Sequence, residues 1–332
     1  MNTRIFHMVT LMTGVACTSP TPEPTVDKRG TNEAPDQPER NEDGPNCPGF
    51  PDAQIGLAPS EASTAAAASN ALTCLGLLPG YYERCPSLDN PTTGEAMCPA
   101  LARGIAYPGQ RVLCGACLAT RAQMLTYGIQ AFARPNTVAE VRGCAMDGRC
   151  EGWRLCSESL SGELDENDWV TSFIGWAIAP ERAFFRGDGS PEATEHRTCR
   201  PHSPALYIEA ATYFARLSAM DPADARANIT EVADAYADAL SRAEHFCGYA
   251  GVAADGQWWI PATVVMNNLG IMCMSTNADG LRTANICGTE ALAECHLTHA
   301  QLAIMSARLH GLIPRAECVP IKPVCSYRNH RL

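Results

Sequence analysis

Cysteine is the feature that most constrains what this chain folds into. The sequence has 17 cysteines among 332 residues, far more than proteins of a reducing compartment normally carry. Either disulfide bonds or zinc sites account for such a number. Zinc modules need paired close spacings, but the sequence has one C-x-x-C, at Cys114 and Cys117, and its other cysteines are at least five intervening residues apart. The pattern therefore favours disulfides in an oxidising compartment.

Sixteen cysteines are candidates for pairing, and their spacing leaves the connectivity open. They are Cys47, Cys74, Cys85, Cys98, Cys114, Cys117, Cys144, Cys150, Cys156, Cys199, Cys247, Cys273, Cys287, Cys295, Cys318 and Cys325. The C-x-x-C pair also matches a thioredoxin-type redox motif, which follows a strand and sits at a helix N-terminus. We expect no strand there and place both cysteines on the apolar face of a helix, so we interpret the pair as structural.

The N-terminal segment has the features of an export signal. Residues 1–16 begin with a positive charge and continue with the apolar stretch IFHMVTLMTGVA, which is too short to span a bilayer. The final letters GVAC resemble the lipobox of bacterial lipoproteins, in which signal peptidase II cuts before a cysteine that then carries lipid. Val15 and Ala16 fit that pattern, whereas Gly14 departs from it because leucine usually stands there. The resemblance implies lipid attachment at Cys17, and ordinary secretory cleavage remains the alternative.

A proline-rich acidic segment follows this cysteine. Residues 18–46 contain six prolines, seven acidic residues, three basic residues and no aromatic residue, which is the composition of a disordered tether. The predicted order is a signal peptide at 1–16, the lipidated cysteine and tether at 17–46, and a cysteine-rich domain at 47–328. That domain could divide into two subdomains near residues 160–168.

The domain is predicted to be mainly α-helical, a disulfide-braced bundle of about eight helices with long loops. Apolar residues recur at intervals of three and four, and no hairpin or alternating strand stands out. Residues 205–240 faintly resemble a tetratricopeptide helix pair, but no second copy follows at that family's 34-residue period. Two of the predicted helices begin at Ser60 and Pro204. The others span residues 110–134, 137–146, 150–160, 169–178, 222–248, 261–274 and 289–311.

Composition excludes several classes of function. The formal net charge of −11 argues against nucleic-acid binding, which needs clustered Lys and Arg. No apolar run after the N-terminal segment reaches the 18 or so residues of a membrane-spanning helix. The sequence also lacks the phosphate-binding, dinucleotide-binding and nucleophile-elbow motifs, so no organic cofactor is predicted.

Histidines of the last predicted helix are candidate metal ligands. His296 and His299 would lie one turn apart on one face of that helix and could share a metal ion. His310 lies three turns further on and is too distant to join them. The spacing differs from the H-E-x-x-H motif of zinc proteases. Semi-buried histidines with hydrogen-bond partners would give the same pattern.

Other polar clusters have simpler interpretations. The predicted 222–248 helix carries a charged face of Glu231, Asp234, Asp238, Arg242 and His245, which an amphipathic helix with a solvated face explains. The loop at 184–202 has arginines that could hold an anionic ligand, and it contains an Arg-Gly-Asp tripeptide at 186–188. Trp258 and Trp259 could stack on sugars, although adjacent tryptophans usually serve packing.

Together these features predict a lipoprotein on the periplasmic or cell-surface side of a bacterial envelope. Its helical domain would be displayed from the membrane and bind another protein, wall material or a small ligand. One alternative is a metal-dependent envelope enzyme that uses the histidines of the C-terminal helix. Another is a freely secreted structural domain. The ligand is not predicted.

Overall fold

A computed structural model of the chain describes part of its residues. These are 50, 52–54, 59–75, 77–78, 84–86, 95–97, 112–144, 156, 170–179, 182–185, 199–226, 229–241, 258–276, 282–284, 292 and 294–321. Residues Pro45–Leu332 form one compact unit. The predicted signal peptide, lipidated cysteine and tether lie outside the described residues, as does the predicted division near 160–168.

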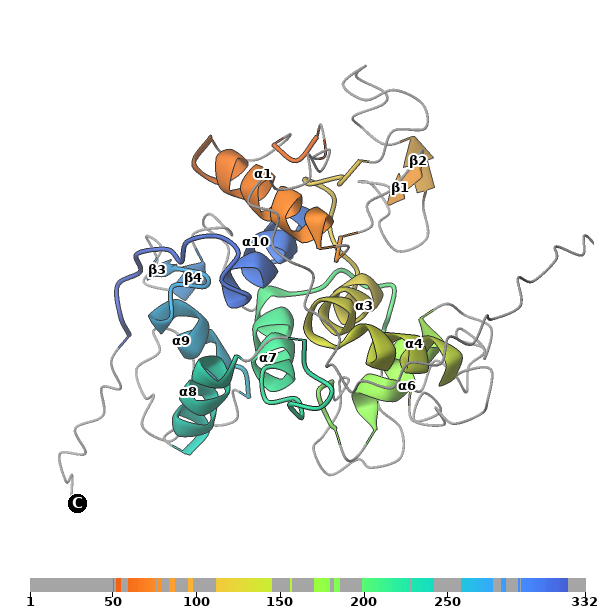
Figure 1. The fold of residues 1–332 in the computed structure, drawn as a ribbon. Helices are drawn as coiled ribbons and strands as arrows, with labels where there is room; N and C mark the ends of the chain where they lie inside the picture. The colour runs from red at the N-terminus through yellow and green to blue at the C-terminus, as the bar shows by residue number, and fades with distance from the viewer. Residues whose placement is uncertain are drawn as a thin grey trace, which may run out of the picture. The chain divides into compact units, whose positions relative to one another are not determined.

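The described residues are mainly α-helical, which confirms the predicted fold class (Figure 1). They contain eight helices: α1 (Pro59–Cys74), α3 (Arg121–Phe132), α4 (Pro135–Cys144), α6 (Thr171–Ile178), α7 (Tyr207–Leu217), α8 (Thr230–Ser241), α9 (Ile260–Asn268) and α10 (His299–Leu309). Two short antiparallel hairpins, which the sequence did not predict, pair β1 (Arg84–Pro86) with β2 (Glu95–Met97) and β3 (Met274–Thr276) with β4 (Arg282–Ala284).

Two helices begin later than their apolar periodicity indicated, and the helix predicted from Pro222 begins only at Thr230, as α8. The chain is turned or extended from residue 112 to 120, and α3 begins only at Arg121. Likewise, the helix predicted from Thr289 begins at His299. The apolar residues ahead of α3 and α10 are buried in extended segments, so their spacing mimics a helical stripe without forming one.

Matching threonines set these helix starts. The Thr120 hydroxyl accepts a hydrogen bond from the Gln123 amide at 3.2 Å, and the Gln123 side-chain oxygen accepts from the Thr120 amide at 2.8 Å. Thr298 and Gln301 make the same two bonds at 3.3 and 2.8 Å. Such reciprocal bonds satisfy amides that a helix N-terminus leaves without partners.

Three extended segments, which lead into α3, α7 and α10, join in a closed ring of backbone hydrogen bonds. The Ala119 amide donates to the Leu297 carbonyl, the Leu297 amide to the Ala205 carbonyl, and the Ala205 amide to the Ala119 carbonyl, at 2.8 to 2.9 Å. We call these segments (117–121, 203–207 and 295–299) the junction.

A second set of three backbone hydrogen bonds joins the same three segments. Each first helical residue donates its amide to a carbonyl of the next segment, at 2.8 to 3.0 Å. The donors and acceptors are Arg121 to Ser203, Tyr207 to Cys295, and His299 to Cys117. Because corresponding atoms form both sets, the three segments are related by an approximate threefold axis.

The amino-acid sequence carries a trace of this relation. The segment CLATRAQ at 117–123 is identical to CHLTHAQ at 295–301 in four of seven positions. The corresponding segment SPALYIE at 203–209 has glutamate where the other two have the capping glutamine. The three N-cap positions, Thr120, Leu206 and Thr298, are 86 and 92 residues apart, so a search at a 34-residue period does not find them.

Each junction helix packs against at least one helix outside the junction. The most extensive of these pairs are α3 with α6, α7 with α9, and α10 with α1, while α3 also contacts α4 and α7 also contacts α8. Figure 1 shows α1 lying across α10, so the first and last described helices complete the third pair. Ala65, Ala68 and Leu72 of α1 are fully buried at intervals of three and four, and their mostly small side chains permit close approach.

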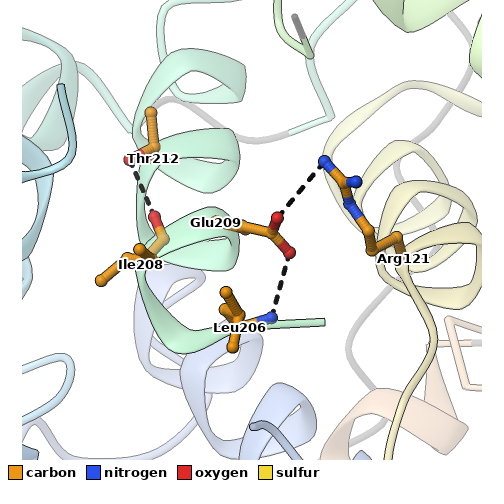
Figure 2. Close-up of polar contacts among 5 residues, drawn as sticks. All are labelled: Arg121, Leu206, Ile208, Glu209 and Thr212. Carbon is orange, nitrogen blue, oxygen red and sulfur yellow. Dashed lines mark hydrogen bonds and ion pairs between the residues drawn. The ribbon is translucent and has the colours of Figure 1, made fainter. Parts of the chain in front are cut away.

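A buried ion pair joins α3 to α7 (Figure 2). A guanidinium nitrogen of Arg121 lies 3.3 Å from a carboxylate oxygen of Glu209, and the two side chains are only 3% and 9% exposed. The other oxygen of Glu209 accepts the Leu206 amide at 3.1 Å. Glu209 therefore caps α7 as Gln123 and Gln301 cap their helices, and it also binds Arg121.

Disulfides connect the described cysteines, as the sequence predicted. All eight cysteines whose side chains the structure describes are disulfide-bonded. Three pairs are defined within the described residues: Cys114–Cys117, Cys156–Cys199 and Cys273–Cys318. Cys74 and Cys295 are also bonded. The side chains of the other predicted candidates, Cys47, Cys85, Cys98, Cys144, Cys150, Cys247, Cys287 and Cys325, lie outside the described part of the chain.

The disulfides indicate an oxidising compartment and an exported protein. The two longer bridges join cysteines 43 and 45 residues apart. Each would stabilise the fold by roughly 4 kcal/mol if it acted alone. None of the helices in the described ranges combines the length and apolar character needed to cross a bilayer.

Candidate functional site

A pocket of about 590 Å³ opens between α6, α7, α8 and the turn before α9. This volume lies within the range of pockets that hold small molecules. Both aromatic and charged side chains line the pocket. Segments from residue 176 to residue 258 contribute to it, so it depends on the tertiary fold.

Aromatic rings form much of the pocket lining. Trp176 and Phe184 pack together with ring centroids 5.4 Å apart, and both are buried. Tyr236 comes from the buried face of α8. Trp258 differs from these rings because it is 51% exposed. Its neighbour Trp259 is only 3% exposed, so the adjacent tryptophans divide between the pocket rim and the core.

Two arginines line the same pocket. The Arg182 guanidinium lies 4.7 Å from the centroid of the Trp176 ring, within the range of a cation–π contact. Arg216 is in the last turn of α7, where a basic residue is favourable, and donates to the Phe184 carbonyl at 3.4 Å. Both guanidinium groups are thus held against the aromatic residues of the lining.

Two aspartates, Asp221 and Asp224, also line the pocket, and their negative charges balance the positive charges of the two arginines. An oxygen of Asp221 accepts the Ala223 amide at 2.8 Å, a short-range bond typical of turns. An oxygen of Asp224 accepts the Thr137 hydroxyl at 3.1 Å, which ties the turn to α4. An ionised carboxylate offers about four acceptor positions. The pocket can therefore present acceptors and donors to one ligand.

The structure places the two candidate metal ligands in different surroundings. His296 is exposed in the extended segment before α10, where its backbone pairs with Leu206. His299 is the first residue of α10 and is buried; burial lowers its pKa to about 4. The described side chains contain no group of three or more potential metal ligands. A site with these two histidines stays a prediction, but they do not share a helix as the sequence indicated.

The remaining histidine of that segment, His310, follows α10 directly. Its ring makes an edge contact with Phe132, at 4.9 Å between centroids. Burial, together with the positive charge of Arg226, lowers the pKa of His310 to about 4. Both His299 and His310 are therefore neutral in the folded protein near pH 7.

The charged residues of α8 face away from the core. Glu231, Asp234 and Asp238 are exposed, whereas Val232 and Tyr236 are buried. Glu231 binds Arg315 at 2.7 Å on the surface. This supports the interpretation of a solvated helix face. Arg242 and His245, the other predicted members of that face, lie outside the described residues.

The C-x-x-C pair lies in a turn before α3 and not on a helix. Cys114 adopts a left-handed backbone conformation with a φ of 54°. Both oxygens of Asp52 hold this turn by accepting the Leu113 and Cys114 amides at 2.7 Å. Cys114 and Cys117 are buried and joined to each other, which agrees with a structural role. The predicted helical placement is wrong because the turn precedes the cap at Thr120.

Sequence reasoning missed most of the pocket. It singled out Trp258 but none of the charged lining residues. The pocket lining also includes Leu240 of α8, an apolar residue that is exposed. The Arg-Gly-Asp tripeptide and most of the predicted 184–202 loop, residues 186–198, lie outside the described residues.

Comparisons of this chain with models of protein families, with curated proteins and with solved structures find no match. Conclusions about function therefore depend on the chain's own residues.

Proposed function

We propose that this chain is an exported, lipid-anchored binding protein whose pocket between α6, α7 and α8 holds a small molecule or the end of a polymer. The observation that carries the proposal is an exposed tryptophan, Trp258, at the rim of a pocket that also contains two arginines and two aspartates. Concave sites with aromatic walls and a few polar groups are the usual form of ligand pockets.

The anchor rests on the sequence around Cys17. The lipobox-like GVAC and the proline-rich acidic segment after it have the order of a lipid attachment point followed by a tether. Lipoprotein modification adds several acyl chains, and two or more chains give stable membrane attachment. Disulfides in the domain agree with export.

Detergent phase partitioning tests the anchor. The wild-type protein is expected in the detergent phase, and Cys17→Ser, which cannot be lipidated, is expected in the aqueous phase. The serine variant should fold normally because the sixteen cysteines of the predicted domain remain available for pairing with one another. Recovery of both proteins in the aqueous phase would overturn the anchor and leave the secreted alternative.

Thermal-shift measurements test the pocket. Neutral glycosides, short peptides and organic phosphates would be screened against the wild type, Trp258→Ala and Leu75→Ala. Leu75 is 47% exposed and is not among the lining residues, so it is a matched control. We expect at least one class to stabilise the wild type and Leu75→Ala but not Trp258→Ala. No stabilisation by any class, or equal stabilisation of all three proteins, would overturn a binding function for the pocket.

A further inference from the structure

We infer that the ligand of this pocket is an uncharged sugar, a neutral pyranoside that stacks on Trp258 and hydrogen-bonds to the charged side chains around it. This inference rests on the proposed binding function and names the chemical class of the ligand.

The balance of charge among the described lining residues favours an uncharged ligand. Arg182 and Arg216 carry two positive charges, and Asp221 and Asp224 carry two negative charges. An anionic ligand would approach two carboxylates, and a cationic ligand would approach two guanidinium groups. Like-charge contacts of this kind are unfavourable at a binding site. A neutral ligand avoids both.

The ligand must nevertheless supply many hydrogen bonds. Guanidinium groups only donate and ionised carboxylates only accept, whereas a hydroxyl group does both. A polyhydroxylated ring can therefore bind arginine and aspartate with neighbouring groups. Asp221, Asp224 and Arg216 are each held by a hydrogen bond to their own fold, so little ordering is needed when the ligand binds.

Trp258 supplies the apolar contact that a sugar requires. A pyranose ring has a face of C–H groups, which packs on a flat aromatic ring. The Trp176 ring is already covered by the Arg182 guanidinium, and Trp176 is buried. Trp258 is the lining tryptophan with half of its surface open. Tryptophan is suited to this role because it combines a large apolar surface with few rotatable bonds.

Matched sugars test the inference. Methyl glucoside, methyl glucuronide and methyl glucosaminide share one ring and differ in charge, and disaccharides of neutral hexoses and of N-acetylglucosamine extend the neutral series. Binding would be followed by tryptophan fluorescence and by calorimetry. We expect binding by at least one neutral sugar, with each charged analogue at least tenfold weaker. Trp258→Ala should weaken binding of the neutral sugar at least tenfold, and Trp258→Phe should restore part of it.

Two further variants separate sugar recognition from folding. Asp221→Asn and Asp224→Asn keep the size of each side chain but replace a carboxylate with an amide, and each should weaken sugar binding several-fold. Leu75→Ala should bind as the wild type does. Circular dichroism and denaturation curves would show that every variant is folded.

The outcomes distinguish the two proposals. Preference for the glucuronide or the glucosaminide, or binding only of the peptides or phosphates screened above, would overturn the sugar inference and leave the pocket as a binding site. Sugar binding that persists in Trp258→Ala would overturn the assignment of this pocket to sugar. Absence of any bound probe would overturn both proposals.

Discussion

The carboxylate of Glu209 binds the guanidinium of Arg121 with one oxygen and caps its own helix with the other (Figure 2). The pair thus connects the start of α3 to the start of α7. Arg121 also lies over the ring of Phe185, at 5.0 Å from the guanidinium carbon to the ring centroid. The three-way junction therefore includes a desolvated charge pair at one of its three contacts.

Breaking this pair should be costly. Removal of one partner leaves a buried charge without its counter-ion, so Arg121→Met is expected to lower the free energy of unfolding by about 3–5 kcal/mol. Glu209→Gln keeps an oxygen that can cap α7, as the glutamines of α3 and α10 do, but loses the charge. The double variant should lose less than the sum of the single variants in guanidinium denaturation. Full additivity would show that the pair is not coupled.

The capping threonines should contribute measurably to stability. Thr120→Ala and Thr298→Ala each remove a hydroxyl that accepts a helix amide, and each should lower the free energy of unfolding by about 0.5–2 kcal/mol. Thr120→Ser and Thr298→Ser keep the hydroxyl and serve as controls. If the alanine and serine variants had equal stability, the hydroxyl bonds would have no part in starting these helices.

Close packing of α3 on α7 depends on Gly128. A methyl group at this position would collide with the Tyr213 ring and the Leu217 side chain. Gly128→Ala should therefore lower the free energy of unfolding by about 1–3 kcal/mol, although alanine favours a helix by about 1 kcal/mol over glycine. Gln130→Ala, two residues further along α3, should change stability by less than about 0.5 kcal/mol. A stabilised Gly128→Ala protein would contradict the close contact.

Acid should weaken the fold through His299. The pKa of this residue falls from 6.5 to about 4 on burial. Between these values the unfolded chain binds a proton that the folded chain does not, so the free energy of unfolding decreases as the pH falls. The full effect of this residue is about 3 kcal/mol. It develops as the pH falls from 6.5 to 4 and is absent above that range.

Denaturation midpoints measured from pH 7 to pH 4 would reveal this effect. His299→Gln should show a smaller loss of stability over the range than the wild type. His296→Gln, at an exposed position, should keep the wild-type dependence. Equal slopes for the wild type and His299→Gln would show that His299 does not titrate in this way.

Local sequence patterns were sufficient to predict the fold class and the positions of several helices. The alanine-rich helix predicted from Ser60 is α1, which spans Pro59–Cys74. The apolar stretch at 169–178 contains α6, Thr171–Ile178. The first prediction followed from alanine-rich composition, since alanine favours helices, and the second from the helical spacing of Trp169, Phe173 and Trp176. Disulfide bonding followed from cysteine number and spacing, without any knowledge of the fold.

The junction could not be predicted from local patterns. Its bonds join residues as distant as Cys117 and His299, which are 182 positions apart. The apolar residues of the extended segments before α3 and α10 are buried, so these segments have apolar residues at spacings that resemble those of a helix face. The similarity of CLATRAQ to CHLTHAQ was present in the sequence, but seven residues at such a separation stand out only when the structure brings them together.

The pocket could not be predicted from the sequence for a related reason. Its charged residues lie on a turn after α6, in α7 and in the turn before α8, and none belongs to a recognisable motif. In the sequence they are ordinary surface residues. Only Trp258 had a property that pointed to binding, since adjacent tryptophans suggested either sugar stacking or packing, and the structure assigns one residue to the rim and one to the core.

The most direct test of the oxidised, exported domain is alkylation of its thiols. The unreduced protein would be unfolded in guanidinium, alkylated and analysed by mass spectrometry. We predict no label on the eight described cysteines before reduction and full labelling afterwards. These are Cys74, Cys114, Cys117, Cys156, Cys199, Cys273, Cys295 and Cys318. Labelling of most of them without reduction, or stoichiometric zinc in the native protein, would contradict the disulfide-braced fold and the export that it implies.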